Sequence, residues 1–191
     1  MATDALREFT TAMDELVAAD ADAAARAAGA AKFLPELLAH PEFLSDEHRV
    51  GSTEHYTQHV VHVHESGAYS VVALVWLPGQ RTPIHDHRCW CVVGVLQGAE
   101  REVRYHLVSD GADEWLTEQE SQRNQPGSVS VLVPPEENIH LVENTCDGTA
   151  ISIHVYGDDI ATVGSSVNKV FTQEVRDDTG TAVGWRAKAA R

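Results

Sequence analysis

The chain has 191 residues, which suits one domain, and its 14 Lys and Arg against 29 Asp and Glu give a net charge of −15 at pH 7. Such an acidic chain repels nucleic acids and anionic membrane surfaces, so we expect neither as a partner. With no apolar run of membrane-spanning length, no signal-peptide pattern at its N-terminus and only three cysteines, the sequence favours a cytoplasmic protein in a reducing compartment.

The N-terminal segment, residues 2–40, has a helical pattern. It is rich in Ala, Leu and Glu, and its apolar residues recur at spacings that predict an amphipathic helix: Leu6, Phe9, Met13, Leu16 and Val17. A second helix is expected to run to about Leu38 and to stop at His40-Pro41, because the residue before a proline disfavours helical geometry. We therefore expect residues 1–45 to form a helical cap.

Short β-prone runs, separated by Gly, Pro, Asn and Asp, fill residues 50–171. The expected strands are 59–64, 69–77, 91–96, 102–107, 129–133 and 150–156. Many short strands at regular spacing predict a β-sandwich or a barrel. Residues 160–171 are expected to form a short terminal helix. The tail after Asp177 is expected to be loosely ordered or paired at a sheet edge.

Three histidines form the densest candidate site. Residues i and i+2 of a strand point to the same side, so His85 and His87 are expected to aim two imidazoles at one point. His140 follows a turn-prone stretch, residues 134–138, and begins a new expected strand, which makes it the candidate third ligand. Three neutral imidazoles do not offset the charge of a bound divalent ion, so such a site favours further ligands that are anionic. The same set of ligands suits Zn, Cu and Ni as well as Fe.

The two histidine segments resemble the two cupin motifs. In the first, G-x5-H-x-H-x3,4-E-x6-G, the matching residues are Gly79, His85, His87 and Gly98, and Cys91 stands where the glutamate ligand is usual. In the second, G-x5-P-x-G-x2-H-x3-N, the matches are Pro135, His140 and Asn144, while Glu137 and Val129 replace the glycines. The resemblance implies an all-β cupin, a small double-stranded β-barrel or jelly roll with N-terminal helices. We expect residues 1–191 to form a single cupin domain with its barrel core at 50–171.

With Cys91 in the glutamate position, the chain is similar to the thiol dioxygenases of the cysteine dioxygenase family. The alternating strand at 150–156 places Ser152, His154 and Tyr156 on one face, and this row resembles the Ser-His-Tyr relay of that family. The resemblance implies one Fe(II) per chain on His85, His87 and His140, and a catalytic role for the relay. It further implies oxidation of a small thiol by O2 to a sulfinic acid.

The substrate-binding residues match the family pattern less closely than the metal-binding residues do. Tyr56 matches the tyrosine of a family Y-x-R stretch, but Gln58 stands where cysteine dioxygenases carry an arginine, as in the 3-mercaptopropionate branch. That branch has an arginine shortly after the relay tyrosine; here Ser165 lies near that place and Lys169 is the only cation within residues 157–170. Arg81 or Arg88 is the candidate replacement. The substrate thus stays open among L-cysteine, 3-mercaptopropionate and related mercapto-acids.

Cys91 and Tyr156 occupy the positions that form a thioether crosslink in some family members, and they are a candidate pair for one here. An alternative pairs Cys89 with Cys91 as extra metal ligands. The family also implies a monomer or a small homo-oligomer. Two rival functions remain: a cupin with another metal and a non-thiol substrate, and a non-catalytic metal-binding cupin.

Other polar residues receive structural interpretations. His59, His62 and His64 form a cluster that suits either a second metal site or, as we favour, partly exposed strand positions. Six glutamates of the strand region are expected to lie on solvated faces: Glu100, Glu102, Glu118, Glu120, Glu136 and Glu137.

Overall fold

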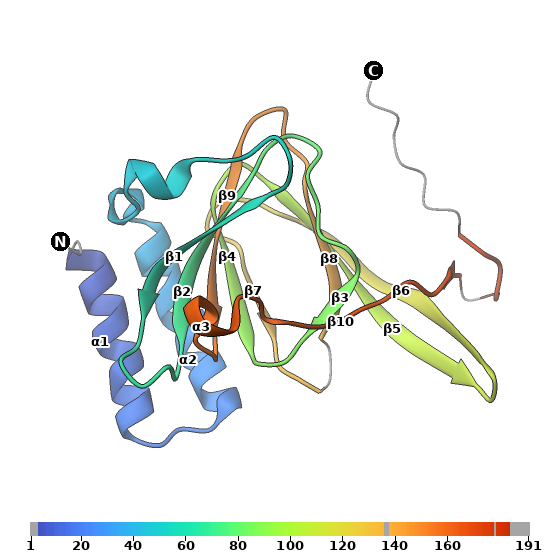
Figure 1. The fold of residues 1–191 in the computed structure, drawn as a ribbon, viewed down its shortest axis with the longest axis horizontal. Helices are drawn as coiled ribbons and strands as arrows, with labels where there is room; N and C mark the ends of the chain where they lie inside the picture. The colour runs from blue at the N-terminus through green and yellow to red at the C-terminus, as the bar shows by residue number, and fades with distance from the viewer. Residues whose placement is uncertain (1–3, 136–137, 178, 184–191) are drawn as a thin grey trace.

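The computed structural model describes residues 4–135, 138–177 and 179–183 (Figure 1). Its helices are α1 (Asp4–Ala18), α2 (Ala23–Leu38) and α3 (Ile160–Val163), with two 3₁₀ turns at Pro41–Phe43 and Asp46–Arg49. The strands are β1 (Thr57–Val63), β2 (Ser70–Trp76), β3 (His85–His87), β4 (Cys91–Gln97), β5 (Glu100–Asp110), β6 (Asp113–Asn124), β7 (Val129–Leu132), β8 (Ile139–Asn144), β9 (Ala150–Tyr156), β10 (Val167–Val170) and β11 (Val175–Arg176).

The strands form two facing sheets that enclose the interior of a barrel (Figure 1). One sheet has the order β1-β2-β9-β4-β7, and the other has the order β10-β3-β8-β5-β6-β11. Every pair except β11 with β6 is antiparallel. The expected all-β cupin with N-terminal helices is confirmed. The assignment of residues 1–191 to a single domain stays a prediction.

The two long helices cover the outer face of the first sheet (Figure 1). The apolar face of α1 buries Leu6, Phe9 and Met13, while α2 begins at an Asp22 cap whose side chain accepts a hydrogen bond from the Ala25 amide at 2.8 Å. A Cβ at Gly94 of β4 would lie 2.7 Å from a methyl of Leu34, so this glycine lets α2 approach the sheet. Within the described residues, no helix is long and apolar enough to span a bilayer.

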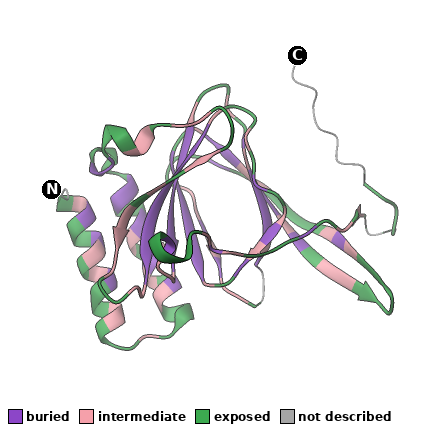
Figure 2. Cartoon of the chain, in the orientation of Figure 1, coloured by how far each residue is buried: buried purple, intermediate pink, exposed green. Residues whose placement is uncertain are grey.

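Strands β2 and β9 are buried along their whole length (Figure 2). One face of each strand packs under the helices, and the other faces the barrel interior. This double burial explains why Ser70–Trp76 and Ala150–Tyr156 are apolar at most positions rather than alternating with charged residues. The few polar side chains on β9 therefore lie inside the barrel.

The expected helix at 160–171 was wrong beyond its first turn. Helix α3 ends at Val163, where Gly164 adopts a φ of +77° that stops the helix, and residues 167–170 form β10 instead. Strand β10 pairs with β3 and covers its edge. Strand β6, which is mostly exposed and has no apolar run, was not expected from the sequence. Strand β11, just before the tail, pairs with β6, and Ala182 of the tail pairs with Arg176 in an isolated bridge. Residues 178 and 184–191 of the tail lie outside the described part of the chain.

Candidate metal centre

His85, His87 and His140 come together inside the barrel. His85 and His87 lie on β3, and His140 lies opposite His85 on the neighbouring β8. Their ring centroids are 4.8 to 4.9 Å apart, and one ligand nitrogen from each lies within 4.8 Å of the others. All three side chains are buried. The period-two arrangement on β3 and the pairing with β8 thus produce the convergent imidazoles that the sequence predicted.

Each imidazole is oriented by a hydrogen bond at its Nδ1 atom. The Nδ1 atoms of His85, His87 and His140 lie 3.0 Å from the Pro83 carbonyl, the Asn138 side-chain oxygen and Glu102 Oε1, respectively. An Nδ1–H that donates to such an oxygen leaves Nε2 with its lone pair toward the cluster. The three neutral histidines therefore have their tautomers set by these partners, in a form that could bind a metal ion.

The protonation state of His85 and His87 favours the binding of a cation. Burial, and next the charge of His140, lowers the pKa of His85 to about 3, and the same two causes, with a further contribution from His85, lower that of His87 to about 2. Both imidazoles are neutral at pH 7 and free to coordinate an ion without first losing a proton. The charge of Glu102, which is hydrogen-bonded to His140, would balance part of the charge of a divalent ion.

Ser152, His154 and Tyr156 of β9 form a hydrogen-bonded row on the interior face, here called the polar row. His154 Nε2 lies 3.0 Å from the Ser152 hydroxyl, and His154 Nδ1 lies 3.0 Å from the Tyr156 hydroxyl. Burial lowers the pKa of His154 to about 3 and raises the pKa of Tyr156 well above its usual value. The ring of Tyr156 lies 6.4 Å from that of His87, so the row ends beside the histidine cluster.

Cys91 lies beside the polar row. It pairs with Tyr156 across the β4–β9 ladder, and its Sγ is 3.9 Å from His154 Nδ1. Burial raises the pKa of Cys91 well above its usual value, and burial likewise raises that of Cys89 to about 11. Neither thiol is ionised at neutral pH, and neither joins the histidine cluster within the described residues. The arrangement does not favour the alternative of two extra thiolate ligands.

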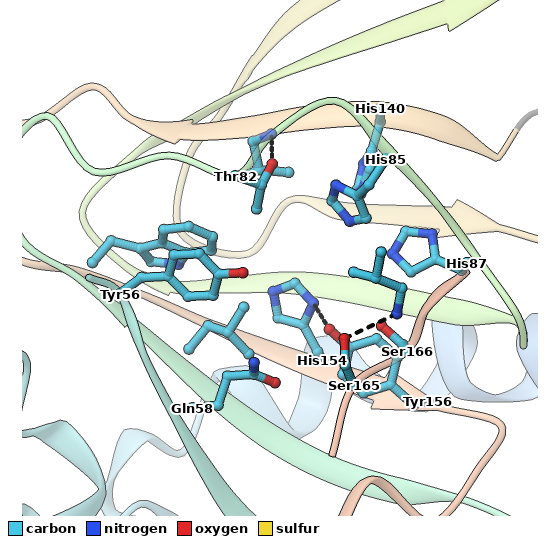
Figure 3. A pocket seen from close by; sticks show the side chains of 14 residues that line it. Tyr56, Gln58, Thr82, His85, His87, His140, His154, Tyr156, Ser165 and Ser166 are labelled. Carbon is cyan, nitrogen blue, oxygen red and sulfur yellow. Dashed lines mark hydrogen bonds between the residues drawn. The ribbon is translucent and has the colours of Figure 1, made fainter. Parts of the chain in front are cut away.

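A small cavity opens onto the histidine cluster (Figure 3). Its volume of about 20 Å³ is enough for about one water molecule. Tyr56, stacked on Trp76 at 4.5 Å, and Gln58 line the cavity with the histidines and the polar row. The structure thus brings Tyr56 and Gln58 to the site. The full lining is Tyr56, Gln58, Leu74, Trp76, Thr82, His85, His87, His140, Val142, His154, Tyr156, Ser165, Ser166 and Val167.

The structure does not bring Arg81 or Arg88 to this cavity. Both are exposed, and Arg81 instead pairs with Glu143 in an isolated β-bridge and lines a separate, larger cavity beside β10. Lys169 is exposed over the ring of Phe171, whereas Ser165 does line the site. No Arg or Lys is among the described residues of the lining, so the polar end of a ligand would meet neutral side chains there.

The expectation that Glu100 and Glu102 lie on a solvated face was wrong. Both point into the barrel from β5 with exposed fractions of 1% and 2%. Glu102 is held by hydrogen bonds to His140 and Ser130, and these interactions outweigh burial and lower its pKa to about 2. Glu118 and Glu120 are exposed as expected, and residues 136–137 lie outside the described part of the chain.

Sequence reasoning missed Glu102 and Asn138, which orient His140 and His87, because neither belongs to a histidine-spacing pattern. No sequence signal marked Glu102, because the apolar residues of β5 lie on the opposite face, at Val103, Tyr105 and Leu107. The cluster of His59, His62 and His64 does not form a second metal group among the described residues, and its histidines are partly exposed, as we favoured. Instead, His62 and His64 lie near Tyr69 and Asp14 of α1.

The barrel and the histidine cluster define a cupin with a candidate metal site. The sequence matches the family model of cysteine dioxygenase type I over residues 46–165, which is more than half of the chain. The chain therefore belongs to the cysteine dioxygenase type I family. Membership implies a dioxygenase; it does not by itself identify the thiol or the metal.

Solved structures give weaker likenesses. A double-stranded β-helix protein from Klebsiella pneumoniae is 21% identical, with 61% of this chain and 89% of that chain covered and a TM-score of 0.45. A cupin 2 conserved barrel domain protein from Salinispora arenicola is 18% identical, with 60% and 86% covered and a TM-score of 0.42.

Proposed function

We propose that this protein is a non-haem Fe(II) thiol dioxygenase that oxidises a small thiol with O2 to its sulfinic acid. The candidate thiols are L-cysteine, 3-mercaptopropionate and related mercapto-acids. The observation that carries the proposal is a three-histidine cluster with no carboxylate ligand among the described residues, next to the Tyr156 end of the polar row. A monomer or small homo-oligomer in the cytoplasm remains the expectation from the sequence.

The histidine cluster fits a divalent metal ion by its donor set. Three buried imidazoles converge, and their outer nitrogens all have hydrogen-bond acceptors. When bound there, Fe(II) would supply the redox chemistry and a positive charge that favours the thiolate form of the substrate. His85, His87 and His140 are the residues that would hold it.

The remaining side chains of the cavity bind and orient the substrate, which must push some of them apart, because the empty space holds about one water molecule. Gln58 and Tyr56 lie at one end of the cavity and the histidines at the other, so the thiol group would point to the histidines (Figure 3). Gln58, Ser165 and Ser166 supply neutral donors to the polar end of the substrate. The Tyr156 hydroxyl, held by His154, faces the reacting sulfur. Overall, R–SH and O2 give R–SO2H, with both oxygen atoms added to sulfur.

We also propose the thioether between Cys91 Sγ and a ring carbon of Tyr156. Their facing positions on β4 and β9 support it. Bond formation removes one hydrogen from each residue, and the two electrons pass to O2, which becomes hydrogen peroxide. The intact protein should then weigh two hydrogens less than its sequence, and Cys91→Ser should restore the full mass. An unmodified mass after turnover with iron and thiol would contradict the crosslink.

Oxygen uptake by iron-loaded protein against a panel of small thiols tests the function. We expect uptake with at least one mercapto-acid, with one O2 consumed per thiol. His85→Ala, His87→Ala and His140→Ala should each lose iron and uptake together. His106→Ala, at an exposed position on β5, is the matched control and should retain both. Full iron occupancy in all three site variants would contradict the assigned ligands, and no uptake with any thiol would contradict the proposed reaction.

A further inference from the structure

Glu100 is a buried acid that the proposed reaction does not use. Its exposed fraction is 1%, and its Oε1 atom has no hydrogen-bond partner among the described residues. A buried carboxyl group without full hydrogen bonding costs free energy in either protonation state, and more when it is charged.

The surroundings of Glu100 connect it to the polar row. It lies two residues before Glu102 on β5 and so faces the same interior, where Ser152 is the side chain that stabilises its charged form. Its ladder partners on β6 and β8 are the uncharged Asn124 and Asn144. Glu102 is the neighbouring charge that acts on it. The Glu100 carboxyl group thus lies at the Ser152 end of the polar row, and the Tyr156 hydroxyl lies at the other end.

We propose that Glu100 is a positioning residue: its protonation state sets the direction of every hydrogen bond in the polar row, and so decides whether Tyr156 offers a proton to the cavity. The consequence for catalysis rests on the proposed function, whereas the hydrogen-bond switch itself does not. The Ser152 hydroxyl is the branch point of this hydrogen-bond network, because it donates one hydrogen bond and accepts two.

An ionised Glu100 side chain can only accept hydrogen bonds. The indole of Trp76 donates to the Ser152 hydroxyl oxygen at 3.0 Å, and the Ser152 proton must go to the carboxylate. The oxygen then accepts a second hydrogen bond, from His154 Nε2–H. Neutral His154 has no proton left on Nδ1, so Tyr156 donates its hydroxyl proton to Nδ1, and only its oxygen lone pairs face the cavity.

Protonated Glu100 reverses the row. The carboxylic acid and Trp76 now both donate to the Ser152 oxygen, so the Ser152 proton goes to His154 Nε2. The proton of neutral His154 is then on Nδ1 and is donated to the Tyr156 oxygen. The Tyr156 hydroxyl proton is then released from His154 and can be donated to Ser166 or to a ligand beside the histidines. Both arrangements satisfy the hydrogen-bonding atoms of Ser152 and His154.

The two states are accessible near neutral pH. Burial raises the pKa of Glu100 to about 7, against the opposing hydrogen bond from Ser152, and the charge of Glu102 raises it further. His154 stays neutral there, because burial lowers its pKa to about 3. Below the pKa of Glu100, Tyr156 is a proton donor to the cavity, and above it Tyr156 is an acceptor.

Nitrogen NMR of ¹⁵N-histidine-labelled protein tests the switch without any turnover, since the two neutral tautomers of His154 have distinct ¹⁵N shifts. The measurement uses the full chain with excess Zn²⁺, which is diamagnetic. We expect His154 to change from the Nδ1–H to the Nε2–H tautomer as pH rises through about 7. A single His154 tautomer across neutral pH would overturn the proposal.

Two variants separate the switch from general pH effects. Glu100→Gln should abolish the pH-dependent tautomer change, while Glu120→Gln, the same substitution at an exposed position, should keep it. If Glu100→Gln does not fold, Ser152→Ala replaces it, because it disconnects the carboxyl group from His154 and should also fix the tautomer. A switch that persists in the folded variant would overturn the proposal. A switch without thiol oxidation would instead overturn the proposed function alone.

Discussion

Replacing Glu102 with glutamine removes the charge behind His140 and keeps the shape of the side chain. Glu102 Oε1 accepts from His140 Nδ1 at 3.0 Å, and its other oxygen accepts from Ser130 at 2.6 Å. The amide oxygen of glutamine still accepts from Nδ1–H, so the His140 tautomer is retained. What is lost is the negative charge that makes Nε2 a stronger donor to a cation.

The expected effect of Glu102→Gln is a 10- to 100-fold weaker metal affinity, or about 1.4 to 2.8 kcal/mol. Removing the acceptor altogether, in Glu102→Leu, should cost more, since His140 then loses its fixed tautomer and a buried N–H loses its partner. The order wild type, Gln, Leu follows from the geometry, because charge and hydrogen bond are removed in succession.

Metal affinity is measured anaerobically by competition between the protein and a chelator of known Fe(II) affinity. Glu118→Gln, which removes the same charge from an exposed position on β6, is the matched control and should bind like wild type. Circular dichroism of each variant shows whether the fold is retained. Wild-type affinity in a folded Glu102→Gln would refute the role assigned to this carboxylate.

Three further predictions concern the polar row and the core. Tyr156→Phe should retain the metal but lower kcat about 100-fold or more, because the phenol proton is lost from the reacting site; steady-state oxygen uptake measures this. Neutral His154, with its pKa lowered to about 3 by burial against about 6.5 in the unfolded chain, contributes stability that is present above about pH 6.5. That stability is lost as pH falls toward 3, so urea unfolding should show a shallower acid loss in His154→Gln. Gly94→Ala, whose Cβ would lie 2.7 Å from Leu34 Cδ2, should destabilise the protein by about 1–3 kcal/mol in thermal unfolding.

Each of these predictions has a matched control. Tyr105→Phe changes a buried tyrosine outside the cavity and should leave kcat unchanged. His106→Gln changes an exposed histidine and should follow the wild-type acid loss. Gly148→Ala places its Cβ in open space and should be tolerated. Equal behaviour of a variant and its control would count against the corresponding prediction.

The sequence predicted the candidate site best where its residues lie two positions apart on one strand. His85 with His87, and Ser152 with His154 and Tyr156, lie two residues apart, so one face of each strand carries them regardless of the detailed packing. The convergence with His140 required the pairing of β3 and β8, which the cupin resemblance implied and spacing alone did not.

The sequence misled where a charged residue is buried. Acidic side chains are almost always exposed, so Glu100 and Glu102 were assigned to solvent, yet their partners His140 and Ser152 come from strands distant in the sequence. The helix expected at 160–171 failed for a similar reason. Residues 167–170 become a strand because β3 offers them an unpaired edge, which no local pattern reveals.

The central claim is that both atoms of O2 are added to the sulfur of a small thiol. Mass spectrometry of the product formed by iron-loaded protein under ¹⁸O₂ tests it most directly. We expect a sulfinic acid that carries two ¹⁸O atoms, formed by wild type and not by the metal-free His140→Ala variant. A disulfide as the sole product, or a sulfinate whose oxygen comes from water, would contradict it.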